Sequence, residues 1–142
     1  MVWTVELTDA VQEFLLGLES DDRNAVLGSI KVLESIGPHL GRPHADVLVA
    51  SRHSNMKELR TSRGDRQYRV LFAFDSRRMA ILLVGGEKLA FPGGPDAFYK
   101  RFIKEADDLF DQHKRSLEVK KAGSEKSRPK AAGNRKGRGH KG

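Results

Sequence analysis

The order of apolar and polar residues predicts a strand followed by two helices in the first part of the chain. Apolar and polar residues alternate with period two over residues 3–8, as in a half-buried strand. Two stripes of apolar residues with helical spacing then predict helices over residues 9–19 and 20–36, the second ending at Gly37-Pro38. The first stripe comprises Val11, Phe14, Leu15 and Leu18, and the second comprises Val26, Leu27, Ile30 and Leu33. Residues 38–53 lack periodicity and are expected to form a long connection.

The pattern then predicts three strands and a third helix. Residues 55–61, 67–74 and 79–85 are rich in β-forming residues and are separated by polar turns, which indicates an antiparallel meander. A helix is predicted over residues 96–113. Its apolar stripe comprises Phe98, Phe102, Ala106 and Leu109. We therefore expect an α+β fold, with a small antiparallel sheet, two N-terminal helices packed on one of its faces and one C-terminal helix.

Length and composition favour one intracellular domain with a tail. A chain of 142 residues supports one core, which we assign to residues 1–113. Residues 114–142 form a basic tail, and residues 120–142 carry too little apolar surface to offset the entropy of ordering them, so disorder in isolation is expected. Cysteine is absent, which excludes disulfides and cysteine chemistry and fits a reducing compartment. With no signal peptide or membrane-length apolar run in the sequence, a cytoplasmic location is expected.

The net charge of +7 comes from the tail. Residues 114–142 contain 11 Lys and Arg against 2 Asp and Glu, so residues 1–113 hold 15 basic and 17 acidic side chains. Within this body, residues 52–78 hold 8 basic against 3 acidic side chains, whereas residues 1–51 hold 3 against 8. The middle of the chain is therefore expected to provide a basic face.

The turn between the first two strands of the meander predicts which residues oppose each other. Gly64 and Asp65 suit a two-residue hairpin loop. This register places Arg60 opposite Arg69, on the sheet face that does not carry Leu59, Tyr68, Val70, Phe72 and Phe74. Two opposed arginines are unfavourable unless something negative lies between them, which suggests an anion site. The alternative is a solvated face on which each arginine pairs with Glu58, Asp65 or Asp75.

A tight turn at Ser76-Arg77 would place Arg69 opposite Val84, with Gly86 and Lys88 on the arginine face. Other chemistry finds little support in the sequence. No His and carboxylate pair has metal-ligand spacing, and the glycine pairs lack the context of a phosphate-binding loop. Neither a metal nor a cofactor is expected.

Three segments together resemble a known family. They are MKELR at residues 56–60, YRVLFAFD at residues 68–75 and AILLVGGEK at residues 80–88. With the order of elements, they resemble the HigB-like, phage-associated toxins of the RelE/ParE superfamily over residues 1–113. The resemblance implies a RelE-like fold and a type II toxin that cleaves mRNA in the ribosomal A site. It also implies cleavage without a metal, in which the 2′-hydroxyl attacks the adjacent phosphate.

The resemblance assigns roles to several residues. Arg60, Arg69 and Lys88 match family positions that act on the phosphate, and arginines can bind phosphate oxygens in pairs. RNA contacts are expected from Lys57, Arg63, Arg66 and Arg78, although strand parity places Lys57 on the other face. Where some relatives have a second lysine or a histidine, this chain has Leu89 and Glu87. Glu87, Tyr68 and His53 are the candidates for proton transfer.

Partners and competing functions follow from the same resemblance. The expected partners are mRNA, the ribosome and a helix-turn-helix antitoxin encoded by a neighbouring gene. The rival functions are gyrase inhibition of the ParE type and a nucleic-acid-binding module without catalysis. Because opposed cations repel, replacing Arg60 or Arg69 is expected to leave thermal stability equal or slightly higher. The rate of cleavage is expected to fall on the order of 100-fold or more. The tail is expected to strengthen binding to ribosomal RNA without contributing chemistry.

Overall fold

The computed structural model describes residues 2–127, with side chains described for residues 2–121. The contacts within the structure divide the chain into two units, and the boundary in the sequence lies between Phe110 and Asp111. The first unit contains a five-stranded sheet with the strand order β1-β5-β4-β3-β2. The strands are β1 (Val5–Leu7), β2 (Ala45–Val47), β3 (Lys57–Arg63), β4 (Arg66–Phe74) and β5 (Ala80–Glu87). The helices are α1 (Asp9–Leu16), α2 (Ser20–Ile36), the short η1 (Gly37–His39) and α3 (Gly94–Ser127).

The predicted α+β class is confirmed, with two differences in the sheet. The first strand, β1, pairs in parallel with β5, so the sheet is mixed rather than wholly antiparallel. Residues 45–47, predicted to be part of a connection, form β2, which pairs antiparallel with β3 at the edge of the sheet. A strand of three residues is too short to show period-two alternation, because it has only one full repeat.

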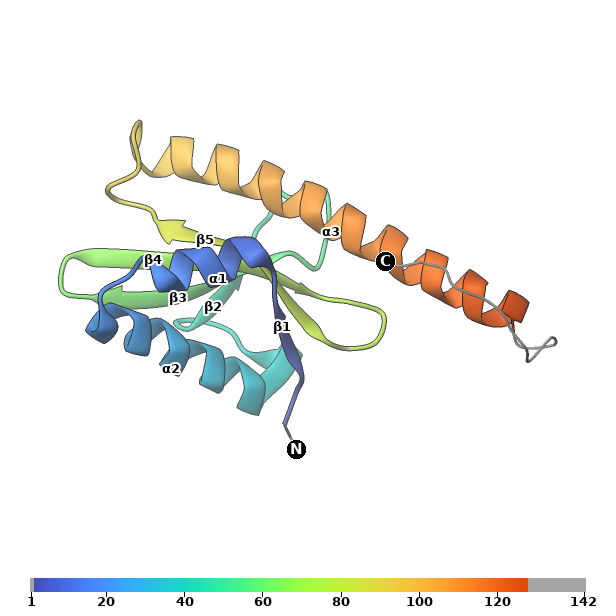
Figure 1. Cartoon of the computed structure of the whole chain (residues 1–142). Helices are drawn as coiled ribbons and strands as arrows, with labels where there is room; N and C mark the ends of the chain where they lie inside the picture. The colour runs from blue at the N-terminus through green and yellow to red at the C-terminus, as the bar shows by residue number, and fades with distance from the viewer. Residues whose placement is uncertain (1, 128–142) are drawn as a thin grey trace. The chain divides into compact units, whose positions relative to one another are not determined.

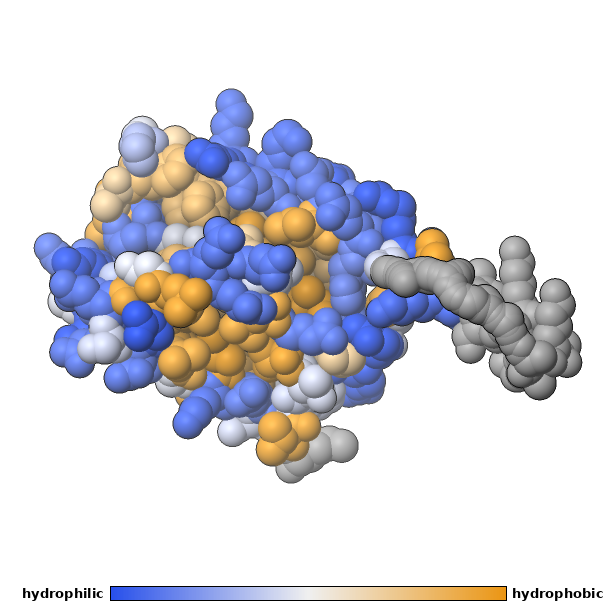
Figure 2. Space-filling model, viewed as in Figure 1, coloured by the Kyte–Doolittle hydropathy of each residue, from blue (hydrophilic) through white to orange (hydrophobic). Residues whose placement is uncertain are grey.

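The two faces of the sheet carry separate parts of the core. In the first unit, α1 and α2 cover one face and the first turns of α3 cover the other (Figure 1). Alternation along β4 accounts for this arrangement, since Val70 and Phe72 pack with the residues of α1 and α2, whereas Leu71 and Ala73 pack with those of α3. On the face that Figure 2 shows, apolar residues gather near α1, bordered by polar residues. The exposed Leu16 lies at the end of this helix.

The β3–β4 hairpin has the register that the sequence predicts. Arg60 lies opposite Arg69 and Thr61 lies opposite Tyr68. Gly64 turns the chain with a φ of 59°, a conformation that glycine adopts without a steric penalty.

The predicted register of the next hairpin was wrong. Arg69 lies opposite Gly86 rather than Val84, because the turn is longer than the two residues assumed and the pairing shifts at Leu71 and Phe72. Arg78, within that longer turn, has a φ of 65°.

The predicted end of the third helix was also wrong. The helix continues past His113 to Ser127. The added residues, such as Leu117, Glu118 and Lys120, are strong helix formers, so helical structure continues where no apolar stripe remains. The rest of the predicted tail, residues 128–142, lies outside the described residues. Along residues 2–127, no helix combines the length and apolar character needed to cross a membrane.

Candidate functional site

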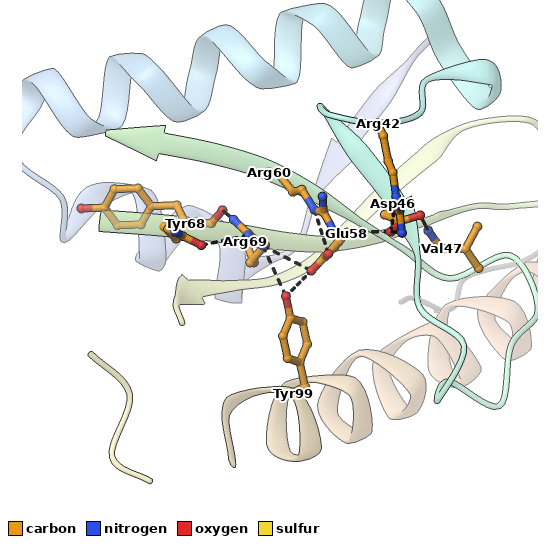
Figure 3. Close-up of polar contacts among 9 residues, drawn as sticks. Arg42, Asp46, Val47, Glu58, Arg60, Tyr68, Arg69 and Tyr99 are labelled. Carbon is orange, nitrogen blue, oxygen red and sulfur yellow. Dashed lines mark hydrogen bonds and ion pairs between the residues drawn. The ribbon is translucent and has the colours of Figure 1, made fainter. Parts of the chain in front are cut away.

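A buried carboxylate lies between the two opposed arginines of β3 and β4. Glu58 is 3% exposed and accepts a hydrogen bond from Arg60 Nε at 3.0 Å and another from the Tyr99 hydroxyl at 2.6 Å. Arg69 Nε lies 3.4 Å from the same carboxylate. Figure 3 shows these side chains converging from the sheet and from α3. We refer to Glu58, Arg60, Arg69 and Tyr99 as the Glu58 cluster.

The Glu58 cluster explains why two arginines can face each other in this sheet. Arg60 and Arg69 do share the α3 side of the sheet, as strand parity predicts, and Tyr99 from α3 contacts both Glu58 and Arg69. The negative group expected between them is Glu58, a residue of the chain itself. The pairing with Glu58, which the sequence left open as an alternative, is therefore present in the structure.

Arg69 is fully engaged by the protein. Its Nη1 donates to the Tyr68 carbonyl oxygen at 3.0 Å and its Nη2 donates to Gln67 Oε1 at 3.2 Å. Its Nε donates to the Tyr99 hydroxyl at 3.3 Å. With a residue exposure of only 5%, this guanidinium is buried, and each of its three nitrogens donates to a group of the protein.

Arg60 is more accessible, because 30% of its side chain is exposed. Its Nη2 lies 3.4 Å from Asp46 Oδ2, a carboxylate of β2 that also accepts from Arg42 Nε at 2.9 Å (Figure 3). The hydrogen bond from Arg42, the backbone N–H of Val47 and the nearby charges hold the pKa of Asp46 below its usual range. Asp46 therefore stays ionised and keeps Arg60 at the edge of the cluster.

Lys88 adds a further cation beside the cluster. Its ammonium lies 5.8 Å from the centre of the Tyr99 ring, within cation–π range. Burial lowers the pKa of Lys88, and the positive charge of Arg69 lowers it further. A lysine with a lowered pKa gives up a proton more readily than a solvated one.

The carboxylate of Glu87, a predicted catalytic residue, is bound by backbone N–H groups of the protein. Its carboxylate accepts from the backbone N–H of Gln67 at 2.7 Å and from that of Ala90. Burial opposes its ionisation, but the backbone N–H groups outweigh burial and lower the pKa of Glu87. The side chain thus joins β4 to the segment after β5, and its low pKa makes it a weak base.

The other two candidates for proton transfer lie away from the Glu58 cluster. Tyr68 is buried on the α1 and α2 side of the sheet and donates to Asp22 at 2.5 Å. Burial and this hydrogen bond raise the pKa of Tyr68 to about 12. The His53 ring packs edge-on against Phe110, with ring centres 5.0 Å apart.

The four residues predicted to contact RNA are not brought together with the cluster. Lys57 lies on the other face, where its ammonium donates to the carbonyl oxygens of Pro38 and Leu40, and burial lowers its pKa. Arg63 and Arg66 both bind Asp22 of α2, at 2.8 and 3.0 Å. The Arg78 guanidinium lies over the Trp3 ring at 4.9 Å.

The cations of residues 52–78 therefore do not form one basic surface. They occupy both faces of the sheet, and several lie next to carboxylates from other elements, among them Asp22 of α2 and Asp46 of β2. A count of charges along the chain cannot detect this pairing, because Asp22 lies more than 40 residues before its partners.

Sequence reasoning gave Glu58 only as an alternative partner of the arginines, and it missed Tyr99. Glu58 precedes Arg60 by two residues in one strand, so parity alone places both on one face. Nothing in the sequence indicated that Tyr99 contacts Glu58, since Tyr99 lies beside the apolar stripe of α3 and 41 residues from Glu58. Among the residues with described side chains, no three His, Asp or Glu groups are arranged to hold a metal ion. The arrangement can bind an anion through Arg60 and Lys88, with Glu58 fixing the first of them.

Comparisons with known proteins show the family. The model of the family described as "Phage derived protein Gp49-like (DUF891)" matches residues 13–111. A Mycobacterium tuberculosis protein named "Putative toxin HigB2" is 42% identical over 112 residues, which are 78% of this chain and 54% of that protein. A second protein from that organism, similarly named as the toxin HigB3, is 45% identical over 84 residues, 59% of this chain and 72% of that protein. The chain thus spans about half of the first relative and nearly three quarters of the second. It belongs to the phage-derived Gp49-like family, and its similarity to these two relatives confirms the HigB-like resemblance predicted from its sequence.

Proposed function

We propose that this protein is the toxin of a type II toxin–antitoxin system and that it cleaves mRNA in the ribosomal A site. The observation that carries the proposal is the pair of partly exposed cations, Arg60 and Lys88, beside a buried carboxylate on one sheet face. Such a pair can hold a phosphodiester and balance the charge that develops on it. The names of the two mycobacterial relatives support the toxin assignment.

The proposed reaction is an attack by the 2′-hydroxyl on the adjacent phosphorus. The 2′-hydroxyl passes its proton to a solvent water as the bond between the 2′-oxygen and phosphorus forms. The bond from phosphorus to the 5′-oxygen breaks, which leaves a 2′,3′-cyclic phosphate and a 5′-hydroxyl. Arg60 binds the non-bridging oxygens, and the Lys88 ammonium donates a proton to the departing 5′-oxygen. The lowered pKa of Lys88 makes its ammonium a stronger acid than that of a solvated lysine, which favours proton donation to the leaving oxygen.

Arg69 and Glu58 act in this proposal as positioning residues. Glu58 accepts a hydrogen bond from Arg60 Nε at 3.0 Å. Arg69 and Tyr99 hold the Glu58 carboxylate in place. Holding Arg60 before the substrate arrives removes part of the entropy cost of forming the reactive arrangement. Glu87 is given a structural role, since its oxygens are taken by backbone N–H groups.

Brief expression followed by primer extension on cellular mRNA tests the proposed function. We expect growth arrest together with discrete new 5′ ends within translated codons. DNA damage without new RNA ends would instead indicate gyrase inhibition. Growth arrest with neither outcome, and with the protein bound to RNA, would indicate a binding module without catalysis.

The proposal includes an antitoxin of the helix-turn-helix type, encoded by an adjacent gene. Such a partner would cover Arg60 and Lys88 and so exclude RNA. Co-expression of the adjacent small gene should restore growth, and a complex of the two proteins should copurify. Continued arrest in the presence of each neighbouring gene would contradict an ordinary toxin–antitoxin pair.

A further inference from the structure

A groove of about 460 Å³ lies beside the Glu58 cluster in the first unit. One wall is a face of α3 and the other is the loop at residues 50–52. The lining residues are Ala50, Arg52, Asp96, Tyr99, Lys100, Ile103, Lys104 and Asp107. The groove falls within the range of roughly 300–1,000 Å³ that is usual for small-ligand sites.

The loop wall is fixed by a buried carboxylate. Asp107, which is 4% exposed, accepts from Ser51 Oγ at 2.5 Å and from the backbone N–H of Arg52 at 3.1 Å. The Arg52 guanidinium is held at the rim by Asp108 at 2.9 Å. The groove is therefore already formed without a ligand, which lowers the cost of binding.

The surfaces that line the groove suit a flat, partly polar ring. Tyr99 offers an aromatic ring, Ile103 and Ala50 offer apolar contact, and Arg52 offers a planar cation. Unstacked RNA bases stack on aromatic rings and on guanidinium planes, and they hydrogen-bond through their edges. Three apolar contacts are too few for the face of an amphipathic helix, which needs anchors over several turns.

Tyr99 connects this groove to the Glu58 cluster. Its ring lines the groove, while its hydroxyl donates to Glu58 at 2.6 Å. Lys88 lies 5.8 Å from the same ring. A chain that places a phosphate against Arg60 and Lys88 would bring a neighbouring nucleotide to Tyr99.

We propose that the groove lined by Tyr99, Ile103 and Arg52 binds one base of the RNA next to the cleaved phosphate, and that it contributes to sequence preference. This inference rests on the proposed function, because it takes the phosphate site at Arg60 and Lys88 as given. Lys100 and Lys104 at the rim contribute charge toward the RNA backbone.

A binding experiment on the full-length protein tests the groove without requiring cleavage. The probe is a 2′-deoxy trinucleotide, which lacks the attacking hydroxyl, and the readout is the change in backbone amide NMR shifts. We expect the changes to cluster at residues 50–52 and 96–104. Changes confined to other residues would overturn the inference.

Two pairs of variants make the binding test specific. Lys100→Glu should weaken probe binding about tenfold, whereas Arg101→Glu, an equal charge change on the neighbouring exposed residue outside the groove, should leave it nearly unchanged. Equal losses would indicate general charge attraction and overturn the inference. Tyr99→Phe keeps the ring but loses the hydrogen bond to Glu58, so it should bind the probe more weakly than the unmodified protein and more tightly than Tyr99→Leu, which loses the ring as well. Melting curves would identify a variant that fails to fold, and the Lys100 and Arg101 pair would still decide the result.

Cleavage mapping separates this inference from the proposed function. If Lys100→Glu and Ile103→Ala cleave mRNA with an altered distribution of sites, the groove contributes to preference. Retained cleavage with an unchanged distribution would overturn the inference and leave the proposed function standing. If the unmodified protein cleaves no RNA, the proposed function fails, and the inference that depends on it fails also.

Discussion

Arg60 and Arg69 are direct neighbours across two strands, yet their surroundings differ. The Arg60 side chain is 30% exposed, whereas that of Arg69 is 6% exposed and bonded through all three nitrogens. A buried charge is stable only while its partners remain, because desolvation removes the alternative of binding water. The two arginines should therefore respond differently to the same substitution.

Replacing Arg60 with alanine should lower activity strongly without unfolding the protein. Its guanidinium is partly exposed, so water can replace it beside the buried Glu58, and the free energy of unfolding should fall by roughly 1–3 kcal/mol, less than for Arg69→Ala. The rate of mRNA cleavage should fall on the order of 100-fold, as when one oxyanion donor is removed. Thermal melting and a cleavage assay on the same preparation check both effects. A full cleavage rate for Arg60→Ala would remove Arg60 from the site.

Replacing Arg69 with alanine should destabilise the fold, contrary to the expectation from repulsion alone. The substitution leaves Glu58 buried with one cation fewer, and breaking a buried pair costs about 3–5 kcal/mol. Arg69→Lys should be intermediate, because it restores charge without the planar fork. Melting curves of both variants give the measurement. An unchanged melting temperature for Arg69→Ala would show that Glu58 does not need this partner.

Replacing Lys88 with arginine should separate charge from proton donation. Burial, followed by the charge of Arg69, lowers the pKa of Lys88 from the ordinary 10.5, so the protonated donor is lost at a lower pH than usual. Cleavage by the unmodified protein should then decline as the pH rises through this lowered pKa. Lys88→Arg, which keeps its proton, should bind RNA but cleave about 100-fold more slowly and without this decline. Single-turnover rates on purified ribosomes would show it, and a normal rate for the variant would exclude Lys88 as the acid.

At the scale of elements, one carboxylate joins the β3–β4 hairpin to α2. Asp22 accepts from Tyr68, Arg63 and Arg66. The hairpin carries Glu58, Arg60 and Arg69 on its other face. Asp22 thus holds in place the strands on which the Glu58 cluster is built.

Asp22→Asn should make the protein less stable near neutral pH and less sensitive to acid. The hydrogen bond from Tyr68, together with those from the arginines, outweighs burial and lowers the folded-state pKa of Asp22 below its usual value of 3.8. This contribution is fully present above the unfolded pKa and is lost as the pH falls through the folded pKa. Denaturant melts across acidic pH should show a shallower loss for the variant. Parallel curves for the two proteins would contradict this role.

The predictability of the two hairpins depended on their turns. The dipeptide Gly64-Asp65 is typical of a two-residue turn, so the pairing of Arg60 with Arg69 could be predicted from the sequence. The turn before β5 includes Arg78 at a positive φ and is accompanied by a shift in pairing, and neither has a sequence signal here. Residue contacts between distant elements, such as Tyr99 with Glu58, were equally invisible, because no local pattern encodes them.

At the scale of the whole molecule, charge is divided between the body and the C-terminal segment. Residues 117–142 carry 9 Lys and Arg against 2 Glu, whereas the body pairs many of its cations internally. The C-terminal charges should therefore dominate the salt dependence of binding to RNA, since each neutralised phosphate releases counterions.

Removing residues 117–142 should flatten the salt dependence of ribosome binding and leave the cleavage positions unchanged. Cosedimentation with ribosomes over a series of salt concentrations measures the first effect, and primer extension measures the second. A slope equal to that of the full chain would place the RNA-binding charges in the body. New cleavage positions would show that the segment helps to place the substrate.

The hydrogen bond between Tyr99 and Glu58 also determines when, during synthesis of the chain, the Glu58 cluster can form. Strands β3 and β4 form a local hairpin and can pair as soon as both have been synthesised, whereas Tyr99 is made 41 residues after Glu58. During translation, Glu58 and the two arginines are thus exposed to water until the start of α3 has left the ribosome. We expect a nascent chain that stops before α3 to lack an ordered Arg60. The protein would then acquire its activity only after the start of α3 has been synthesised.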